Sequence, residues 1–300
     1  MRRTATDDIQ TIVEKIMKDH GQTTGLKPDS PVTDTTQTET TSQGRTEPEN
    51  PPYKCPICKD TFWRQERDAD GNSICYECEC LKVRKAQMRI EKSGLADEIK
   101  EKTFKNFKTD TDWQRDMKET ALAYGKAYFN VKENGGKFPW FFVAGNPGCG
   151  KTHLCTALCG ALLNRGVPVS YMQWVTESRK LRGYAFEQEV FESIIEPYID
   201  IDVLYIDDLF KQPAHKEINV SDAEGKILFE ILNQRYIQNK ATIISTEWYM
   251  DDDELMRFDG ATFSRVVERC GDWRFVLNIE RGPDKNYRLF KHNGKKKEGD

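Results

Sequence analysis

Short apolar runs alternate with stretches of helical periodicity from about residue 140 to residue 277. The runs at 140–144, 167–173, 201–206, 241–246 and 273–277 predict buried strands. Between them, in 154–162, 174–197 and 221–236, apolar residues recur every three or four positions, which predicts helices. Strands that alternate with helices predict a parallel sheet covered on both faces, so the expected fold class is α/β.

The rest of the chain divides into parts of different character. Residues 1–20 predict an amphipathic helix that packs either on this protein or on a partner. Residues 21–52 are rich in Thr, Ser, Pro and acidic residues and predict a flexible linker. A cysteine-rich module and a basic helix are expected over 53–99, a compact α/β domain over 100–292 and a basic, polar tail over 293–300. Within the compact domain, 112–133 predict a helix that ends just before Gly135.

The amino-acid composition limits the cellular location that we expect for this protein. Hydrophobic residues make up 37% of the 300 residues and charged residues 31%. No apolar run approaches the roughly 20 residues of a membrane span, and the first residues lack the apolar core of a signal peptide. We therefore expect a cytoplasmic protein with no membrane partner. The formal net charge of −4 gives no global argument for nucleic-acid binding, so any such surface has to be local.

A phosphate-binding loop follows the first strand of the α/β domain. Gly145-x-x-x-x-Gly150-Lys151-Thr152 lies between a predicted strand and a predicted helix, the context that a Walker A motif requires. Its backbone N–H groups would face the phosphates of ATP, with Lys151 reaching the β- and γ-phosphates and Thr152 binding Mg²⁺. The predicted nucleotide-contacting residues of the loop are Gly145, Asn146, Pro147, Gly148, Cys149, Gly150, Lys151, Thr152 and His153.

Acidic residues end the third apolar run. Asp207 is placed as a Walker B carboxylate is, to hold Mg²⁺ directly or through water. Asp208 stands where a base would orient the attacking water, although an ordinary polar loop residue is the alternative. Ser245, Thr246 and Glu247 end the next strand, where a polar group would lie beside these acids.

Five of the nine cysteines lie between residues 55 and 80. Cys55-x-x-Cys58 and Cys75-x-x-Cys78 form two knuckles joined by a predicted hairpin around Gly71. Four thiolates at this spacing predict a closed, structural Zn²⁺ site. Cys80 is the open question, because it either replaces Cys78 as the fourth ligand or remains a neighbouring thiol.

In the order of these motifs, roughly over residues 100–290, the chain resembles the AAA+ ATPases of the DnaC/DnaI helicase-loader group and the related transposition helper ATPases of the IstB type. The motifs are Gly145–Thr152, Asp207-Asp208, residues 242–247 and Ser264-Arg265. The resemblance implies ATP binding and hydrolysis by an AAA+ P-loop domain at a subunit interface of an ATP-dependent homo-oligomer.

Roles for further residues come from the same resemblance. Arg265 becomes the candidate arginine finger, with Arg269 as its substitute, and Phe104 and Phe107 belong to a lead-in segment near the adenine. Glu247 replaces the Asn that the group often has, and beyond Arg281 and Arg288 no second sensor arginine stands out. The ATPase is therefore expected to be a slow switch.

Two functions are compatible with these features. The zinc module ahead of the ATPase resembles the DnaI arrangement, which favours delivery of a hexameric replicative helicase to single-stranded DNA during DNA replication, with residues 53–99 contacting the helicase. The alternative is a transposition helper that assembles on duplex DNA. The source is left open between a phage and a bacterial cell.

Overall fold

The structure, a computed structural model, describes residues 54–288 except 68–69, 93–94, 185–186, 213–217 and 219. The helix expected at 7–20, the linker expected at 21–52 and the tail at 293–300 lie outside the described residues.

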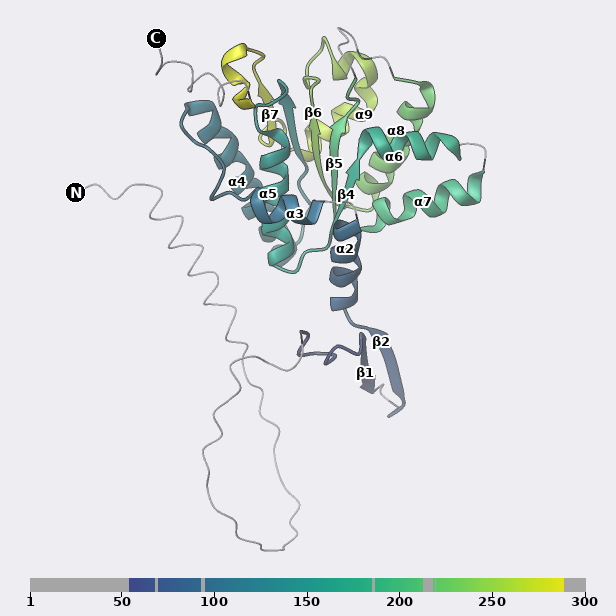
Figure 1. Ribbon diagram of the computed structural model, residues 1–300. Helices are drawn as coiled ribbons and strands as arrows, with labels where there is room; N and C mark the ends of the chain where they lie inside the picture. The colour runs from purple at the N-terminus through teal and green to yellow at the C-terminus, as the bar shows by residue number, and fades with distance from the viewer. Residues whose placement is uncertain are drawn as a thin grey trace, which may run out of the picture. The chain divides into compact units, whose positions relative to one another are not determined.

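A five-stranded parallel sheet forms the centre of the α/β domain (Figure 1). Its strands run in the order β4-β5-β6-β3-β7, and every neighbouring pair is parallel. The strands are β3 (Phe141–Gly145), β4 (Val169–Gln173), β5 (Val203–Leu209), β6 (Ala241–Thr246) and β7 (Val276–Ile279). The predicted α/β class with a parallel sheet is confirmed.

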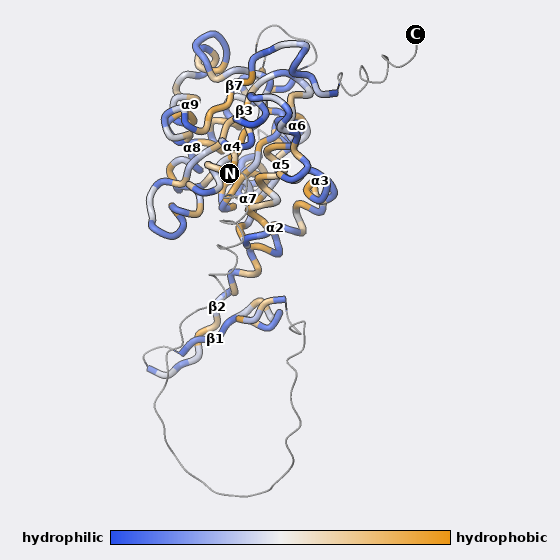
Figure 2. Tube along the Cα trace, turned by 90° about the vertical axis from the view of Figure 1, so that its left-hand side faces the viewer, coloured by the Kyte–Doolittle hydropathy of each residue, from blue (hydrophilic) through white to orange (hydrophobic). Residues whose placement is uncertain are grey.

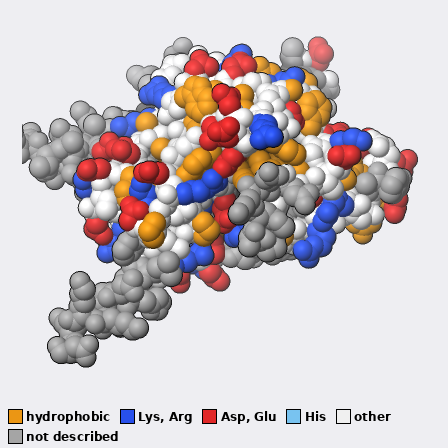
Figure 3. Space-filling view, turned by 90° about the horizontal axis from the view of Figure 1, so that it is seen from above, with side chains coloured by type: hydrophobic (Ala, Val, Ile, Leu, Met, Phe, Trp, Pro, Cys, Tyr) orange, Lys and Arg blue, Asp and Glu red, His pale blue; other side chains and the backbone are white. Residues whose placement is uncertain are grey.

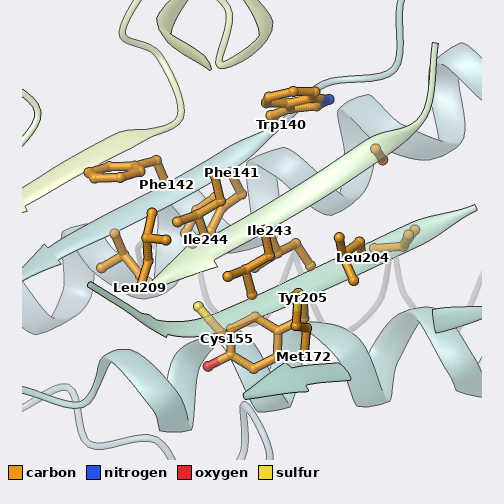
Figure 4. Packing of buried hydrophobic residues seen from close by; sticks show 14 of the residues in the cluster. Trp140, Phe141, Phe142, Cys155, Met172, Leu204, Tyr205, Leu209, Ile243 and Ile244 are labelled. Atoms are coloured by element: carbon orange, nitrogen blue, oxygen red, sulfur yellow. The ribbon is translucent and has the colours of Figure 1, made fainter. Parts of the chain in front are cut away.

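The three central strands are almost entirely buried, as expected for a parallel sheet with both faces covered. Figure 4 shows Phe141 and Ile244 of neighbouring strands side by side, and Cys155 close to Tyr205. Figure 2 shows the same concentration of apolar residues in the sheet and in the helix after β3, with polar residues on the periphery. This packing fixes the strand ends, which carry the predicted site.

Helices cover both faces of the sheet. In Figure 1, α3, α4 and α5 lie on one side and α6, α8 and α9 on the other. The helices are α2 (Cys80–Lys92), α3 (Leu95–Glu101), α4 (Asp112–Asn134), α5 (Lys151–Asn164), α6 (Trp174–Gly183), α7 (Gln188–Asp200), α8 (Asp222–Ile237) and α9 (Leu255–Arg269), with a 3₁₀ turn at Pro283–Lys285. The Ser221–Glu224 capping box begins α8, and α4 ends before Gly135.

Two boundaries differ from the expectation. The last strand begins at Val276 and not at Trp273, because Asp272 and Trp273 have positive φ in a turn. The apolar residues at 273–277 therefore predicted a strand start three residues earlier than the structure shows. Ile90 and Leu95, from α2 and α3, are buried in the main core, so the packed core of the α/β domain includes residues before 100.

Arg235, on α8, connects the helices to the sheet although it is fully buried. Its guanidinium donates to the carbonyls of Tyr198, Ile199 and Ile201 at 2.7–3.0 Å and to Thr242 Oγ1 at 3.0 Å. These carbonyls end α7 and precede β5, where a helix leaves its last acceptors without partners. Burial lowers the pKa of Arg235 to about 9, which still leaves the group charged at neutral pH and able to hold β5 and β6 in place.

The cysteine-rich module contains an antiparallel hairpin of β1 (Trp63–Arg67) and β2 (Ser73–Glu77). The strands are joined around Gly71, as predicted. Every residue of both strands is exposed, so in the described residues the hairpin has no core of its own. Its stability has to come from elsewhere in the module.

Candidate nucleotide and metal sites

The phosphate loop connects the end of β3 to the start of α5. Gly145 and Gly148 have φ values of 139° and 83°, which favour glycine. A Cβ on Gly145 would lie 2.6 Å from the carbonyl oxygen of Ile279, and one on Gly148 would collide with the side chain of Asn286. Both positions therefore need glycine for backbone conformation and for space.

Lys151 turns back into this loop and is 5% exposed. Its Nζ donates to the carbonyl oxygens of Gly145, at 2.7 Å, and Asn146, at 2.9 Å. A bound phosphate would compete with these carbonyls for the same ammonium protons. The lysine is thus held over the loop, where a Walker A lysine acts.

Asp207 lies at the centre of a hydroxyl network and is 4% exposed. Its carboxylate accepts from Tyr205 OH at 2.6 Å, Ser245 Oγ at 2.5 Å and Tyr171 OH at 3.1 Å. Thr152 Oγ1 is 3.3 Å from Asp207 Oδ1, so the two predicted Mg²⁺ ligands face each other. Hydroxyl and carboxylate oxygens are the ligands that Mg²⁺ prefers.

The two tyrosines were not expected at this site. Tyr171 and Tyr205 are register partners on β4 and β5. Burial is the main cause that raises the pKa of both phenols, and the nearby Asp207 raises it further, which keeps them protonated as donors. The only signal in the sequence was a tyrosine in each of the two predicted strands, 167–173 and 201–206.

Asp208 follows Asp207 directly and has a positive φ of 55°. Its carboxylate forms an ion pair with Lys211 at 2.7 Å, and its N–H donates to Ser245 Oγ at 3.2 Å. Asp208 and Glu247 both line a cavity of about 400 Å³ above the phosphate loop. The structure therefore brings the predicted base and the divergent sensor position to the same cavity.

The lead-in segment supplies another wall of this cavity, but through Phe107 and not through Phe104. Phe104 packs partly buried against the core. The ring of Phe107 contacts His153 edge to face, with 5.2 Å between centroids, and a ring nitrogen of His153 lies 3.0 Å from the carbonyl oxygen of Thr103. Burial lowers the pKa of His153, so the imidazole is neutral at pH 7. Of the two phenylalanines expected near the adenine, only Phe107 is among the residues that line this cavity.

The segment after β7 also reaches the phosphate loop. Tyr287 N–H donates to the carbonyl of Gly148 at 3.1 Å, and Asn146 Nδ2 donates to the carbonyl of Gly282 at 2.6 Å. Arg288 lines the cavity, whereas Arg281 is paired with Glu254. Of the two arginines considered as second sensors, only Arg288 lies at the cavity.

Arg265 lies on α9 and is not among the residues that line this cavity. Its Nη1 donates to the carbonyl of Ala261 at 3.1 Å, and its guanidinium lies 6.0 Å from the ring centre of Phe229. Arg269, the substitute, is 4% exposed and donates to Asn239 Oδ1 at 2.6 Å. Arg269 is therefore held by contacts within its own chain, and the side chain of Arg265 is the less constrained of the two arginines.

Four cysteine sulfurs gather in the N-terminal module: Cys55, Cys58, Cys78 and Cys80, all within 4.8 Å of one another. The Sγ atoms are 3.8 Å apart in the Cys55–Cys78 pair and 3.4 Å apart in the Cys58–Cys80 pair. Zn–S bonds of about 2.3 Å in a tetrahedron place sulfurs about 3.8 Å apart. The cluster therefore fits a closed tetrahedral zinc site.

The predicted ligand set is corrected at Cys75. This residue is exposed in the middle of β2, opposite Gln65. Cys78 follows β2, its N–H donating to the carbonyl of Phe62 at 2.7 Å, and Cys80 begins α2. The second pair of thiols is thus Cys78-x-Cys80, because the hairpin ladder holds Cys75 outside the cluster.

Asp60, which the sequence did not single out, supports the first knuckle. Its carboxylate accepts from the N–H of Cys55 at 2.9 Å and from Arg84 of α2 at 2.5 Å. The backbone N–H of Cys58 lowers the pKa of Cys55 to about 7, whereas burial raises the pKa of Cys80. Metal ligation requires thiolates, so metal binding would release protons.

Comparison with known proteins matches residues 77–271 to the family described as IstB-like ATP binding protein. Protein YqaM of Bacillus subtilis (strain 168) is 30% identical over 233 residues, which cover 77% of this chain and 68% of that protein. The phage-like element PBSX protein XkdC of the same organism is 29% identical over 228 residues, covering 75% and 82%. The replicative helicase loader DnaC of Escherichia coli (strain K12) is 26% identical over 196 residues, covering 63% and 72%. The matches confirm the resemblance drawn from the motifs.

Among the described residues, no helix is long and apolar enough to cross a membrane.

Proposed function

Because this chain belongs to the IstB-like ATP binding protein family, we propose that it is an ATP-dependent loader that delivers a hexameric replicative helicase to single-stranded DNA. The strongest support is that the same chain carries a complete phosphate-loop site and, ahead of it, a separate four-cysteine cluster. Its similarity to DnaC loaders points the same way. The work would take place in the bacterial cytoplasm, and the similarity to a phage-element protein suggests a phage origin.

In this proposal the nucleotide site acts as a slow switch. ATP and Mg²⁺ bind on the phosphate loop, with Lys151 on the phosphates and Thr152 and Asp207 on the metal. Asp208 orients the attacking water. The carboxylate of Asp208 forms an ion pair with Lys211, so it has to leave this ion pair before it can act, which would contribute to slow turnover.

The four-cysteine module would hold the helicase. Zinc on Cys55, Cys58, Cys78 and Cys80 would stabilise a hairpin that has no core, and large apolar side chains remain exposed beside it: Ile57 at 72%, Trp63 at 52% and Tyr76 at 41%. Exposed apolar side chains gathered on a small module are typical of protein contacts. By contrast, acidic, basic and apolar side chains alternate on the face of the molecule shown in Figure 3, so the described part of that face carries no broad basic stripe for DNA.

The decisive experiment is light-scattering chromatography of the protein mixed with the host's replicative helicase, with and without ATP. We expect a stable complex that is lost in an Ile57→Asp/Trp63→Ala variant. Arg67→Ala, on the same hairpin, is the matched control and should retain the complex. Zinc content should be unchanged in both variants, because neither alters a cysteine.

A different outcome would favour the second candidate. The matching family takes its name from IstB, and a transposition helper would assemble on duplex DNA. Failure to bind the helicase, combined with ATP-dependent filaments on duplex DNA, would replace the loader proposal with this one.

We also propose that Arg265 acts as an arginine finger on the ATP of a neighbouring subunit. Its position on α9, away from its own cavity, is the arrangement that a finger acting between subunits requires. Arg265→Ala should bind ATP normally but lose about a thousandfold in assembly-stimulated hydrolysis, since a finger stabilises charge only in the transition state. Arg257→Ala, an exposed arginine on the same helix, is the control. Equal turnover in the two variants would exclude the finger.

A further inference from the structure

Gln114, near the start of α4, is a polar side chain that lines the nucleotide cavity and is 8% exposed. Its Oε1 accepts hydrogen bonds from the backbone N–H groups of Asp110, at 2.9 Å, and Thr111, at 3.1 Å. These bonds help to satisfy the free N–H groups at the beginning of the helix. The carbonyl half of the amide therefore has a structural partner.

The amino group of the Gln114 amide has no structural partner among the described residues. Both partners of Gln114 are donors, so the oxygen has to face them and the amide orientation is determined by chemistry. Among the described residues, no acceptor takes a hydrogen bond from Nε2. Nε2 is not among the described polar atoms that are both fully buried and without a partner, so it is open to the cavity. Its two N–H groups are therefore available to a ligand bound there.

The position of Gln114 indicates which part of the nucleotide would supply that partner. The phosphates belong on the N–H groups of the loop, near Lys151, and the γ-phosphate belongs near Asp208 and Glu247. Gln114 lines the same cavity, and its amide is held by Asp110 and Thr111, which follow Phe107 closely in the chain. The rings of Phe107 and His153 form a wall of the kind on which a base rests. In our proposal, a nucleotide with its phosphates on the loop places its base along this wall.

We propose that Gln114 binds the adenine base directly, donating a hydrogen bond from Nε2 to an unprotonated ring nitrogen. Adenine offers such acceptors at N1, N3 and N7. The inference rests on the nucleotide site of the proposed function but not on helicase loading. One side chain would then order the lead-in segment through its oxygen and recognise the base through its nitrogen.

Gln114→Glu separates these two roles. Glutamate retains oxygen acceptors for the N–H groups of Asp110 and Thr111, and it is favoured at this position of a helix. It removes both side-chain donors. The thermal stability of the variant should therefore stay close to that of the wild type, while its contact with adenine is lost.

The test measures affinity for ATP and for 1-deaza-, 3-deaza- and 7-deaza-ATP, each of which replaces one ring nitrogen with carbon. The wild type should bind one of the three about tenfold more weakly than ATP, the loss expected for one hydrogen bond. Gln114→Glu should bind ATP about tenfold more weakly and should no longer distinguish that analogue. A wild type that binds all four nucleotides alike would overturn the proposal, and this measurement needs no variant.

Inorganic tripolyphosphate and Lys151→Ala serve as controls. The new carboxylate of Gln114→Glu repels any polyphosphate, so equal weakening of tripolyphosphate and ATP would assign the effect to charge and overturn base recognition. Loss of ATP binding in Lys151→Ala without any loss in Gln114→Glu would overturn the role of Gln114 alone. Unchanged ATP binding in Lys151→Ala would overturn the nucleotide site together with that role.

Discussion

Replacement of Lys151 with alanine is expected to weaken ATP binding by at least about 100-fold, or about 2.7 kcal/mol. The ammonium of Lys151 is almost fully buried and lies over the phosphate loop. Charge-assisted hydrogen bonds to phosphate are among the strongest in proteins, and in a buried site water screens them little. Isothermal titration calorimetry with ATP and Mg²⁺ measures the difference.

Lys102→Ala is the matched control for this prediction. Lys102 lines the same cavity, and the variant removes the same charge. However, the ammonium of Lys102 is 2.9 Å from Glu98 on the preceding helical turn, so much of its charge is already neutralised. Its loss should change ATP affinity only a few-fold. Comparable losses in the two variants would mean that general charge, and not the phosphate-loop lysine, attracts the nucleotide.

Replacement of Cys78 with serine is expected to abolish stoichiometric zinc binding, while the same replacement at Cys75, three residues earlier, leaves one zinc per chain. Cys78 is 3% exposed within the sulfur cluster, whereas Cys75 is exposed on β2. Structural zinc contributes roughly 10–16 kcal/mol in small modules. Because the hairpin has no core, loss of the metal should unfold it.

Metal analysis by mass spectrometry and limited proteolysis of the N-terminal module test this pair. Cys78→Ser should be cleaved rapidly near the hairpin, and chelation of zinc from the wild type should have the same effect. Cys80→Ser should behave like Cys78→Ser. If Cys80→Ser retained one zinc per chain and Cys75→Ser lost it, the ligand set suggested by the sequence spacing would be the correct one.

The sequence predicted the parts of this protein that are determined locally. The phosphate loop is one short segment in which glycines, lysine and threonine are fixed relative to one another by the backbone, so its position followed from the motif alone. The capping box at Ser221 and the hairpin turn at Gly71 are local in the same sense. Strand order within the sheet did not enter any of these predictions.

Only the tertiary structure decided how residues from different segments meet. Tyr171 and Tyr205 surround Asp207 because β4 and β5 pair in register, and nothing near either residue in the sequence specifies that register. The spacing of the cysteines suggested Cys75, but the hairpin ladder turns Cys75 away and brings Cys80 in.

The nucleotide cavity shows the same division between local and tertiary information. The sequence located its phosphate end, because a loop and its helix make that end by themselves. Phe107 and Gln114, at the end assigned to the base, are joined to the loop only by packing of α4 and the lead-in segment against α5. The sequence by itself thus determined where the phosphate loop lies, and the tertiary structure decided which side chains line the rest of the cavity, because that wall is built from segments distant in the chain.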